Sequence, residues 1–236
     1  MPLPLLVNLA AEWAKRVLIE GDLAIDATVG NGHDTARLAR LVGPAGRVLG
    51  FDIQAEALTR ARKKLQAEGL EDRVHLILDS HANLATWVAP GARPRLVVFN
   101  LGYLPGGDDT VTTKAASTLP ALKAALDLLL PGGLLIVIVY TTREAGRVEA
   151  RVVLEWARNI PPTRADVMRV EPLNTRESAP VLLLIEARGD AAKANGDLRT
   201  SPFIDGYLRP SPSTDGEPDP APGEQADGTP TPSPGD

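Results

Sequence analysis

The chain has 236 residues, 44% of them hydrophobic, with 25 Lys and Arg against 30 Asp and Glu and a net charge of −5. The absence of cysteine excludes disulfides, thiolate zinc sites and cysteine nucleophiles, and three scattered histidines give no pattern for a metal site, so we expect none. The sequence contains no run of about 18 apolar residues and no charged-then-apolar N-terminal segment, which predicts a cytoplasmic protein without a membrane partner.

Composition changes sharply near residue 189, where Pro, Gly, Ser, Thr and Asp begin to dominate and the periodic apolar residues stop. Such a segment cannot bury enough apolar surface to offset the entropy cost of ordering it. We therefore expect a globular domain over residues 1–188 and a disordered tail over residues 189–236. Residues 190–236 hold nine acidic and three basic residues, which leaves 22 basic and 21 acidic residues in the rest of the chain. A near-neutral domain neither demands nor excludes RNA as a partner.

The apolar pattern alternates between helix and strand periods along the chain. Helices are expected over residues 3–19, from about residue 34, and over residues 54–68, 115–130 and 144–158. Parallel strands are expected over residues 23–27, 47–52, 73–78, 95–99 and 134–140, and a closing antiparallel hairpin over residues 166–171 and 181–187. This order predicts an α/β fold with a seven-stranded, mostly parallel sheet that helices cover on both faces.

The loop after the first strand has the sequence D-A-T-V-G-N-G-H-D-T. Gly30 and Gly32 allow the backbone to approach a ligand closely, but the third glycine of the dinucleotide fingerprint is missing, which argues against a nicotinamide dehydrogenase. The loop also carries Asp26 and Asp34, whose carboxylates repel a pyrophosphate and suit a cationic ligand. Taken by themselves, the two glycines can alternatively be plain turn residues that contact no ligand.

The next two strands also end in polar residues. Asp52 follows Gly32 by twenty residues, a position from which a carboxylate accepts both hydroxyls of a ribose, although it can also cap the next helix. The third strand ends in Asp79, Ser80 and His81, which can reach an adenine. Together the strand ends describe a nucleoside-shaped slot without a phosphate cradle. S-adenosylmethionine fits this description better than NAD, ATP or a flavin.

The fourth strand leads into the block F-N-L-G-Y-L-P-G-G-D. Ligands of open α/β sheets lie beyond the carboxyl ends of the strands, so Asn100 is placed to accept a hydrogen bond from an attacking amine. Tyr103 can stack on a flat base, and Asp108 or His81 can take up the amine proton. The alternatives are a packing role for Tyr103 and a turn-closing role for Asp108.

Several basic and hydroxyl side chains are candidates for contact with RNA phosphate. The basic candidates are Arg60, Arg62, Lys63, Lys64, Arg143, Arg147 and Arg151, which are otherwise typical of solvated helix faces. The candidates in the loop before the helix at Ala115 are Thr110, Thr112, Thr113 and Lys114. The loop residues can equally cap that helix.

These blocks, together with L-P-G-G before the fifth strand, resemble a group of class I S-adenosylmethionine-dependent methyltransferases with a Rossmann-like fold. Members of the group were long described as rRNA methylases and are now linked to the tRNA wobble uridine 5-methylaminomethyl-2-thiouridine. The likeness covers nearly all of residues 5–188, and the block from Asn100 to Asp108 is its most specific part. It implies methylation of the amino group of 5-aminomethyl-2-thiouridine at tRNA position 34, with the anticodon stem-loop as the partner.

The resemblance also implies cofactor contacts by position. It places around the methionine part of the cofactor Asp26, Gly30, Asn31, Gly32, Asp34 and Thr35. It places Asp52 and Gln54 at the ribose, Asp79, Ser80 and His81 at the adenine, and Asn100 beside the sulfonium. The chain departs from the group in one place, because Thr142-Arg143 stands where a Gly-His pair commonly follows the tyrosine of the fifth strand. A guanidinium cannot take up a proton, but it can contact phosphate or orient the substrate.

Two alternative functions remain open at this point, and so does the oligomeric state. The same cofactor slot can serve a methyltransferase that acts on rRNA, on a protein side chain or on a small amine. The fold can also serve as a non-catalytic nucleoside- or RNA-binding module, against which Asp52, Asn100 and the acidic first loop argue. The apolar pattern does not define the oligomeric state, so a homodimer is left open.

Overall fold

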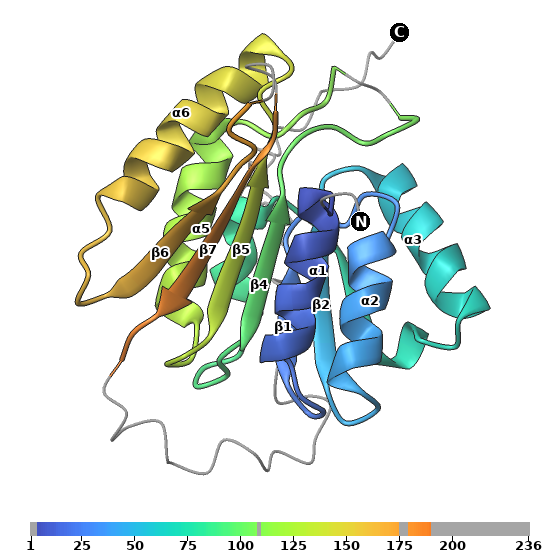
Figure 1. Cartoon of the computed structure of the whole chain (residues 1–236). Coiled ribbons are helices and arrows are strands. Elements are labelled where there is room, and N and C mark those ends of the chain that lie inside the picture. The colour runs from blue at the N-terminus through green and yellow to red at the C-terminus, as the bar shows by residue number, and fades with distance from the viewer. Residues whose placement is uncertain (1–3, 108–109, 175–178, 190–236) are drawn as a thin grey trace, which may run out of the picture.

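The computed structural model describes residues 4–107, 110–174 and 179–189. Its seven strands form one sheet in the order β3-β2-β1-β4-β5-β7-β6, with helices on both faces (Figure 1). The strands are β1 Leu23–Asp26, β2 Arg47–Asp52, β3 Val74–Leu78, β4 Leu96–Asn100, β5 Leu134–Val139, β6 Ala165–Val170 and β7 Val181–Ala187. The predicted tail falls outside the described residues from 190 onward, so its disorder stays a prediction.

Helices cover the sheet in two layers. The helices are α1 Leu6–Val17, α2 His33–Val42, α3 Ala55–Ala67, α4 Leu84–Trp87, α5 Ala115–Leu128 and α6 Glu144–Arg158. One apolar core joins α1, α2 and α3 to one face of the sheet, and a second core joins α4, α5 and α6 to the other face. Figure 1 shows α1 and α2 in front of the sheet and α5 behind it. The central strands β1, β4 and β5 are therefore buried on both sides, as their continuous apolar sequences predict, whereas the edge strands β3 and β6 are partly exposed.

The strand pairing brings the predicted polar strand ends to one edge. β1 pairs in parallel with β2 and with β4, and the order of the sheet reverses at this point. In open α/β sheets ligands bind in the crevice beyond such a reversal. Asp26, Asp52 and Asn100 are the last residues of β1, β2 and β4 and therefore lie at the same edge. The fold thus explains why these three residues belong to one region.

The predicted closing hairpin is confirmed. β7 runs antiparallel to both β5 and β6. Leu184 of β7 pairs with Ile136 of β5 on one side and with Met168 of β6 on the other. Expected and observed element ends differ by a few residues; the first helix, expected over residues 3–19, runs over Leu6–Val17. The pattern missed the four-residue α4, which is too short to show a helical period. Over the part of the chain that the structure describes, no helix has the length and apolar character needed to cross a membrane.

Candidate functional site

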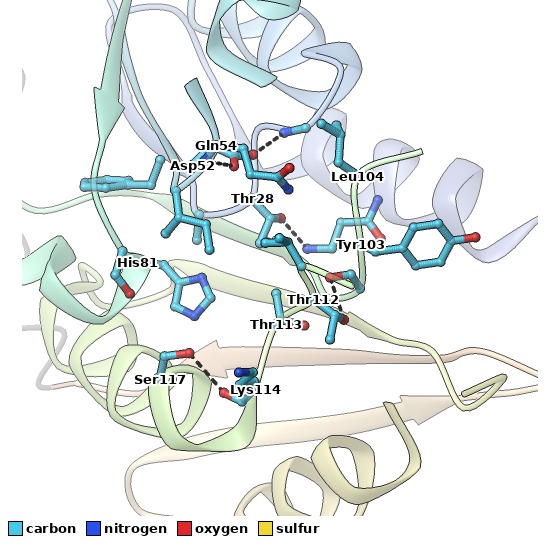
Figure 2. A pocket seen from close by; sticks show the side chains of 18 of the residues that line it. Thr28, Asp52, Gln54, His81, Tyr103, Leu104, Thr112, Thr113, Lys114 and Ser117 are labelled. Carbon is cyan, nitrogen blue, oxygen red and sulfur yellow. Dashed lines mark hydrogen bonds between the residues drawn. The ribbon is translucent and has the colours of Figure 1, made fainter. Parts of the chain in front are cut away.

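A cavity of about 320 Å³ opens at the carboxyl ends of β1 to β4 (Figure 2). Its size falls within the range of small-molecule sites. Eight residues that the sequence predicted for the site line its wall: Gly30, Asp52, Gln54, Asp79, Ser80, His81, Asn100 and Tyr103. Five others, predicted around the methionine part of the cofactor, lie off this wall: Asp26, Asn31, Gly32, Asp34 and Thr35. Asp108, a predicted proton acceptor, lies outside the described residues.

Asp52 connects two of the loops that form the wall. One oxygen of its carboxylate accepts the backbone N–H of Gly30 at 2.8 Å, and the other accepts that of Gln54 at 2.9 Å. α3 begins after Gln54, which is its N-cap residue, so Asp52 stands outside the capping position. An ionised carboxylate has about four acceptor positions, and two protein donors leave room for two ribose hydroxyls.

The first loop is held close to α3 by glycine. Gly30 and Gly32 have φ angles of +52° and +76°, which side chains rarely adopt. A Cβ atom on Gly32 would lie 2.8 Å from the Cα of Ala61, in the middle of α3. Gly32 therefore contributes close packing, whereas Gly30 faces the cavity and donates its N–H to Asp52.

Asp26 lies beneath the first loop and is almost fully buried. It accepts hydrogen bonds from the Thr35 hydroxyl at 2.6 Å and from the Thr28 backbone at 3.1 Å. Burial, assisted by the nearby carboxylate of Asp34, raises the pKa of Asp26 to about 7 despite these hydrogen bonds. Asp34 forms an ion pair with Arg37 on the same helix. Asp26 and Thr35 thus support the loop from below.

Asp79 supports the wall at the end of β3. Its carboxylate accepts the Trp87 indole N–H at 2.8 Å, the Asn83 amide at 2.8 Å and the Ser80 backbone N–H at 2.7 Å. Partial burial opposes ionisation, but these hydrogen bonds outweigh it and lower the pKa of Asp79. His81 lies next to this group with its ring edge-on to Phe99. Burial lowers the pKa of His81, so its ring is neutral at pH 7.

Asn100 lies where β4 leaves the sheet. Its backbone N–H donates to the Thr28 hydroxyl at 2.7 Å, across 72 residues of sequence. The residue lines the cavity, and its side-chain amide makes no hydrogen bond with the residues that the structure describes. An amide held in place through its backbone is thus available to a bound molecule. Thr28 and Leu104 also line the wall, and sequence reasoning gave neither a role.

Tyr103 stands at the rim of the cavity, with 43% of its surface exposed. Figure 2 shows its ring extending away from His81. The guanidinium carbon of Arg143 lies 4.2 Å from the centre of the ring, a cation–π contact that covers one of its faces. Arg143, where the resemblance led us to expect a histidine, is therefore part of the rim, beside the predicted base-stacking side chain.

The segment before α5 forms the wall opposite Asp52. Thr112 donates its hydroxyl to the Gly102 carbonyl at 3.0 Å, and Thr113 donates its hydroxyl to Glu149 at 2.6 Å. The N-cap residue of α5 is Lys114, and no side chain caps the helix. The capping alternative is therefore wrong for Thr112 and Thr113, and their contact with RNA remains a prediction.

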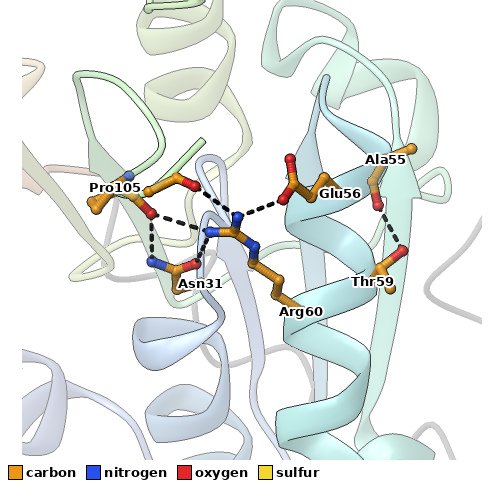
Figure 3. Close-up of polar contacts among 7 residues, drawn as sticks. Asn31, Ala55, Glu56, Thr59, Arg60 and Pro105 are labelled. Atoms are coloured by element: carbon orange, nitrogen blue, oxygen red, sulfur yellow. Dashed lines mark hydrogen bonds and ion pairs between the residues drawn. The ribbon is translucent and has the colours of Figure 1, made fainter. Parts of the chain in front are cut away.

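Arg60 connects α3 to the loop that follows Tyr103 (Figure 3). Its guanidinium donates to the carbonyl oxygens of Pro105 at 3.1 Å and Gly106 at 2.8 Å, and to the side-chain oxygen of Asn31 at 3.2 Å. Glu56, one turn earlier on α3, completes the arrangement through an ion pair. Arg60, a candidate for phosphate contact, instead holds the loop against the beginning of α2. Its predicted contact with RNA remains untested.

The wall suits a nucleoside that carries a positive charge. Its described residues include the carboxylates of Asp52 and Asp79 and a single cationic side chain, Lys114. Asp52 offers oxygen acceptors to ribose hydroxyls, and the backbone at Gly30 lies close to the ligand space without a side chain. These features match the hydroxyl, base and sulfonium groups of S-adenosylmethionine, and they do not form a cradle for phosphate.

Comparisons with known proteins agree with this chemistry. The model of a family described as "Putative rRNA methylase" matches residues 48–186. The chain is 38% identical over 182 residues to the chloroplastic tRNA (mnm(5)s(2)U34)-methyltransferase of Arabidopsis thaliana, a match that covers 74% of this chain and 66% of the relative. The chain thus spans slightly less than two thirds of that relative. A shorter match is to a demethylmenaquinone methyltransferase of Lactobacillus johnsonii. It is 39% identical over 56 residues and covers 24% of this chain and 23% of that relative.

Two solved structures are similar over most of the described fold. A protein from Clostridium thermocellum described as "putative rRNA-methylase" is 38% identical with a TM-score of 0.77, and the match covers 79% of this chain and all of that one. A protein from Streptococcus mutans described as "a putative methyltransferase" and solved in complex with SAH is 36% identical with a TM-score of 0.71. The match covers 79% of this chain and 99% of that one. One of the two similar structures thus contains SAH, which is the predicted cofactor after it has lost its methyl group.

Proposed function

Because the chain belongs to the family described as "Putative rRNA methylase" and is an S-adenosylmethionine-dependent methyltransferase, we propose a specific acceptor for its methyl group. That acceptor is 5-aminomethyl-2-thiouridine at position 34 of tRNA. The acceptor would be the primary amine of that nucleoside. The similarity to the Arabidopsis tRNA methyltransferase supports the choice of substrate. The observation that carries it is Asn100, which lines the cavity and whose side-chain amide has no hydrogen-bond partner among the described residues.

We assign the cavity two halves. The cofactor half is the wall at the ends of β1, β2 and β3, and it includes Gly30, Asp52 and His81. The acceptor half is the wall formed by Asn100 at the end of β4, by Tyr103 and by the segment before α5. When bound, S-adenosylmethionine supplies a methyl group activated by its sulfonium. Residues 1–188 are the proposed catalytic domain.

The protein contributes mainly alignment. Methyl transfer requires the amine lone pair to point along the carbon–sulfur axis, and holding two reactants in that geometry supplies most of the acceleration. In this proposal the Asn100 side-chain oxygen accepts one amine N–H and so directs the lone pair. Asp52 fixes the ribose through its carboxylate, which two backbone N–H groups already orient. Tyr103 would stack on the uracil ring with the face that Arg143 leaves open.

A primary amine is mostly protonated at neutral pH and must lose a proton before it attacks. Deprotonation breaks one N–H bond and leaves the electron pair on nitrogen, while the proton bonds to an acceptor. His81 lines the cavity, and burial lowers its pKa, so its neutral imidazole is an acceptor near pH 7. Asp108, in the same loop region as Tyr103, is the second candidate.

Nucleoside mass spectrometry tests the proposal directly. The purified protein and labelled S-adenosylmethionine are incubated with tRNA that carries 5-aminomethyl-2-thiouridine, with the same tRNA lacking this modification, and with ribosomal RNA. We expect label only in the modified tRNA, as 5-methylaminomethyl-2-thiouridine. Label in ribosomal RNA would instead favour the rRNA alternative that the family description suggests. No label in any RNA would reject RNA as the acceptor.

A further inference from the structure

Glu149 is a buried acid that the proposed mechanism does not use. It lies on α6 with only 4% of its surface exposed. One carboxylate oxygen accepts the Thr113 hydroxyl at 2.6 Å, and the other accepts the Thr118 hydroxyl at 2.6 Å. No ion pair of Glu149 occurs among the residues that the structure describes. The acid therefore depends on two neutral hydroxyl donors.

This arrangement is unfavourable for folding alone. A carboxylate loses its hydration on burial, and neutral donors compensate only part of that loss. Burial accordingly raises the pKa of Glu149, although the hydrogen bonds from Thr113 and Thr118 act in the opposite direction. Ala121 and Leu122 of α5 and Val153 of α6 share one apolar core. A structural role for this part of the interface does not require an acid.

The two threonines connect Glu149 to the cavity at separate points. Thr113 itself lines the acceptor half. Thr118, on α5, has its hydroxyl oxygen 3.5 Å from Nε2 of His81, which also lines the cavity. In Figure 2 the His81 ring and Thr113 face the same space. Glu149 thus lies behind the wall and contacts it through one hydroxyl on each side.

The hydrogen bonds have a direction that matters for His81. Thr118 has one hydroxyl proton and donates it to Glu149, so its oxygen presents a lone pair toward His81. The ring also has a backbone hydrogen bond with Ala27 that favours its protonated form, as donation to a carbonyl does. A neutral imidazole has one N–H, whereas these two acceptors can use both N–H groups of an imidazolium. The surroundings are therefore arranged for a ring that gains a proton.

We propose that Glu149 is a positioning residue of the cavity, which acts through Thr118 on His81 and through Thr113 on the acceptor half. The negative charge keeps the Thr118 hydroxyl turned away from His81, so that a protonated ring finds an acceptor there. The inference rests on the proposed function in one respect, because it assigns His81 the proton that the amine loses. Glu149 itself touches neither the substrate nor the cofactor.

Isosteric substitutions separate charge from shape. Glu149→Gln keeps the volume of the side chain but removes its charge and one acceptor oxygen. Thr118→Val keeps the shape and removes the hydroxyl, while Thr118→Ser keeps the hydroxyl. Val153→Ala, one turn further along α6 and fully buried, is the control for a general loosening of the helix.

Steady-state methylation of modified tRNA is the first measurement. We expect kcat to fall at least tenfold for Glu149→Gln and Thr118→Val, with the KM for S-adenosylmethionine unchanged within twofold. Thr118→Ser should keep kcat within threefold of the wild-type value, and so should Val153→Ala below its melting temperature. Unchanged kcat in Glu149→Gln and Thr118→Val would overturn the proposal. So would a loss in Val153→Ala that equals theirs.

The second measurement needs no methyl acceptor. The imidazole of His81 is titrated by NMR in histidine-labelled protein, with His33 and His75 as references in the same spectrum. Charged groups that line the cavity with His81 are Asp52, Asp79 and Lys114, and Glu149 lies behind the wall. We expect the pKa of His81 to fall by at least half a pH unit in Glu149→Gln and to stay near the wild-type value in Thr118→Ser.

The two measurements distinguish failure of this inference from failure of the proposed function. If wild-type protein does not methylate the tRNA, the proposed substrate is wrong, and the His81 titration still decides whether Glu149 acts on the ring. If the tRNA is methylated but the titration of His81 is the same in wild type and Glu149→Gln, the positioning role is wrong. Should Glu149→Gln fail to fold, the contrast between Thr118→Val and Thr118→Ser gives the same decision.

Discussion

Asp52 and Thr113, one in each half of the cavity, are held in place by different kinds of contact. In the cofactor half, Asp52 receives backbone N–H groups from Gly30 and from Gln54, two residues away. Backbone donors at strand ends are present whatever the neighbouring side chains are. In the acceptor half, Thr113 depends on Glu149, 36 residues further along the chain. The geometry on the acceptor side therefore depends on particular side chains of distant elements.

This difference has a functional consequence. A methyltransferase can keep one cofactor half while it changes its acceptor, because the acceptor half is built from separate, replaceable side-chain contacts. Arg143 over the Tyr103 ring is such a contact. Substitutions in the cofactor half should consequently affect cofactor binding or stability. Substitutions in the acceptor half should affect turnover or the acceptor KM.

The largest expected effect concerns Asp26, the buried support of the cofactor half. Its pKa is raised from 3.8 to about 7, so the folded state holds a proton that the unfolded state releases between these pH values. The contribution of Asp26 to the free energy of unfolding is therefore present at pH 4 and is lost as the pH rises to 7. A shift of about three units corresponds to about 4 kcal/mol.

Urea unfolding of wild type and Asp26→Asn between pH 4 and 8 measures this contribution. The free energy of unfolding of the wild type should fall relative to that of the variant as the pH rises. Subtracting the two curves removes the contributions of other titrating groups, such as Glu149 and His81. A difference that does not change with pH would show that Asp26 is ionised in the folded protein.

The second prediction concerns the acceptor half. Asn100→Ala should lower kcat at least about a hundredfold, as the removal of a single positioned polar group commonly does. The dissociation constant of S-adenosylmethionine, measured by calorimetry, should stay within about tenfold because the residue acts mainly on the amine. Asn159→Ala, at the exposed end of α6, is the matched control. Full turnover in Asn100→Ala would remove the role of this amide.

The third prediction concerns Asp52 and should show the opposite pattern. Removing a charged acceptor of hydrogen bonds costs about 1.5–3 kcal/mol, which corresponds to about a tenfold to hundredfold weaker cofactor affinity in Asp52→Ala. At saturating cofactor, kcat should recover much of its wild-type value. Asp72→Ala, an exposed carboxylate before β3, is the control. Unchanged affinity in the calorimeter would contradict the ribose assignment.

The fourth prediction breaks the contact that joins the two halves. Arg60→Ala removes the donors that hold Pro105 and Gly106 against the first loop, where Leu104 lies 3.8 Å from the position of a Cβ on Gly30. Contacts at this exposed site contribute about 1 kcal/mol, so cofactor affinity should weaken about fivefold. Arg62→Ala, exposed on the same helix, should bind as the wild type does. Equal affinities in the two variants would argue against this role of Arg60.

Arg60 also shows where prediction from sequence ends. The order of elements, the closing hairpin and the position of Asp52 follow from apolar periods and from residues next to strand ends, which are local signals. The contact of Arg60 with Gly106 joins residues 46 apart and appears only when α3 packs beside the loop. On sequence alone this arginine is indistinguishable from its neighbour Arg62 on a solvated helix face.

Buried hydrogen bonds give a second example. Glu149 occurs in a helix with charged residues on several turns, and nothing in its spacing separates it from Glu144, which is exposed. Thr113 was a candidate for capping because hydroxyl residues near a helix start usually serve that purpose, whereas Thr118 had no predicted role. Tertiary packing assigns both hydroxyls to Glu149 instead. The sequence predicted several residues that line the cavity, whereas the hydrogen bonds behind its wall required the structure.

The smallest expected effect concerns the rim of the acceptor half. A cation–π contact at an exposed site contributes about 0.5–1 kcal/mol, so Arg143→Gln should raise the KM for tRNA about threefold and leave cofactor affinity unchanged. The double-mutant cycle with Tyr103→Leu isolates the contact, because coupled residues give non-additive effects. If Arg143 contacts phosphate rather than the ring, the effects should add and the salt dependence of KM should decrease in Arg143→Gln. Arg147→Gln, whose side chain is paired with Glu144, is the control for a general loss of positive charge from α6.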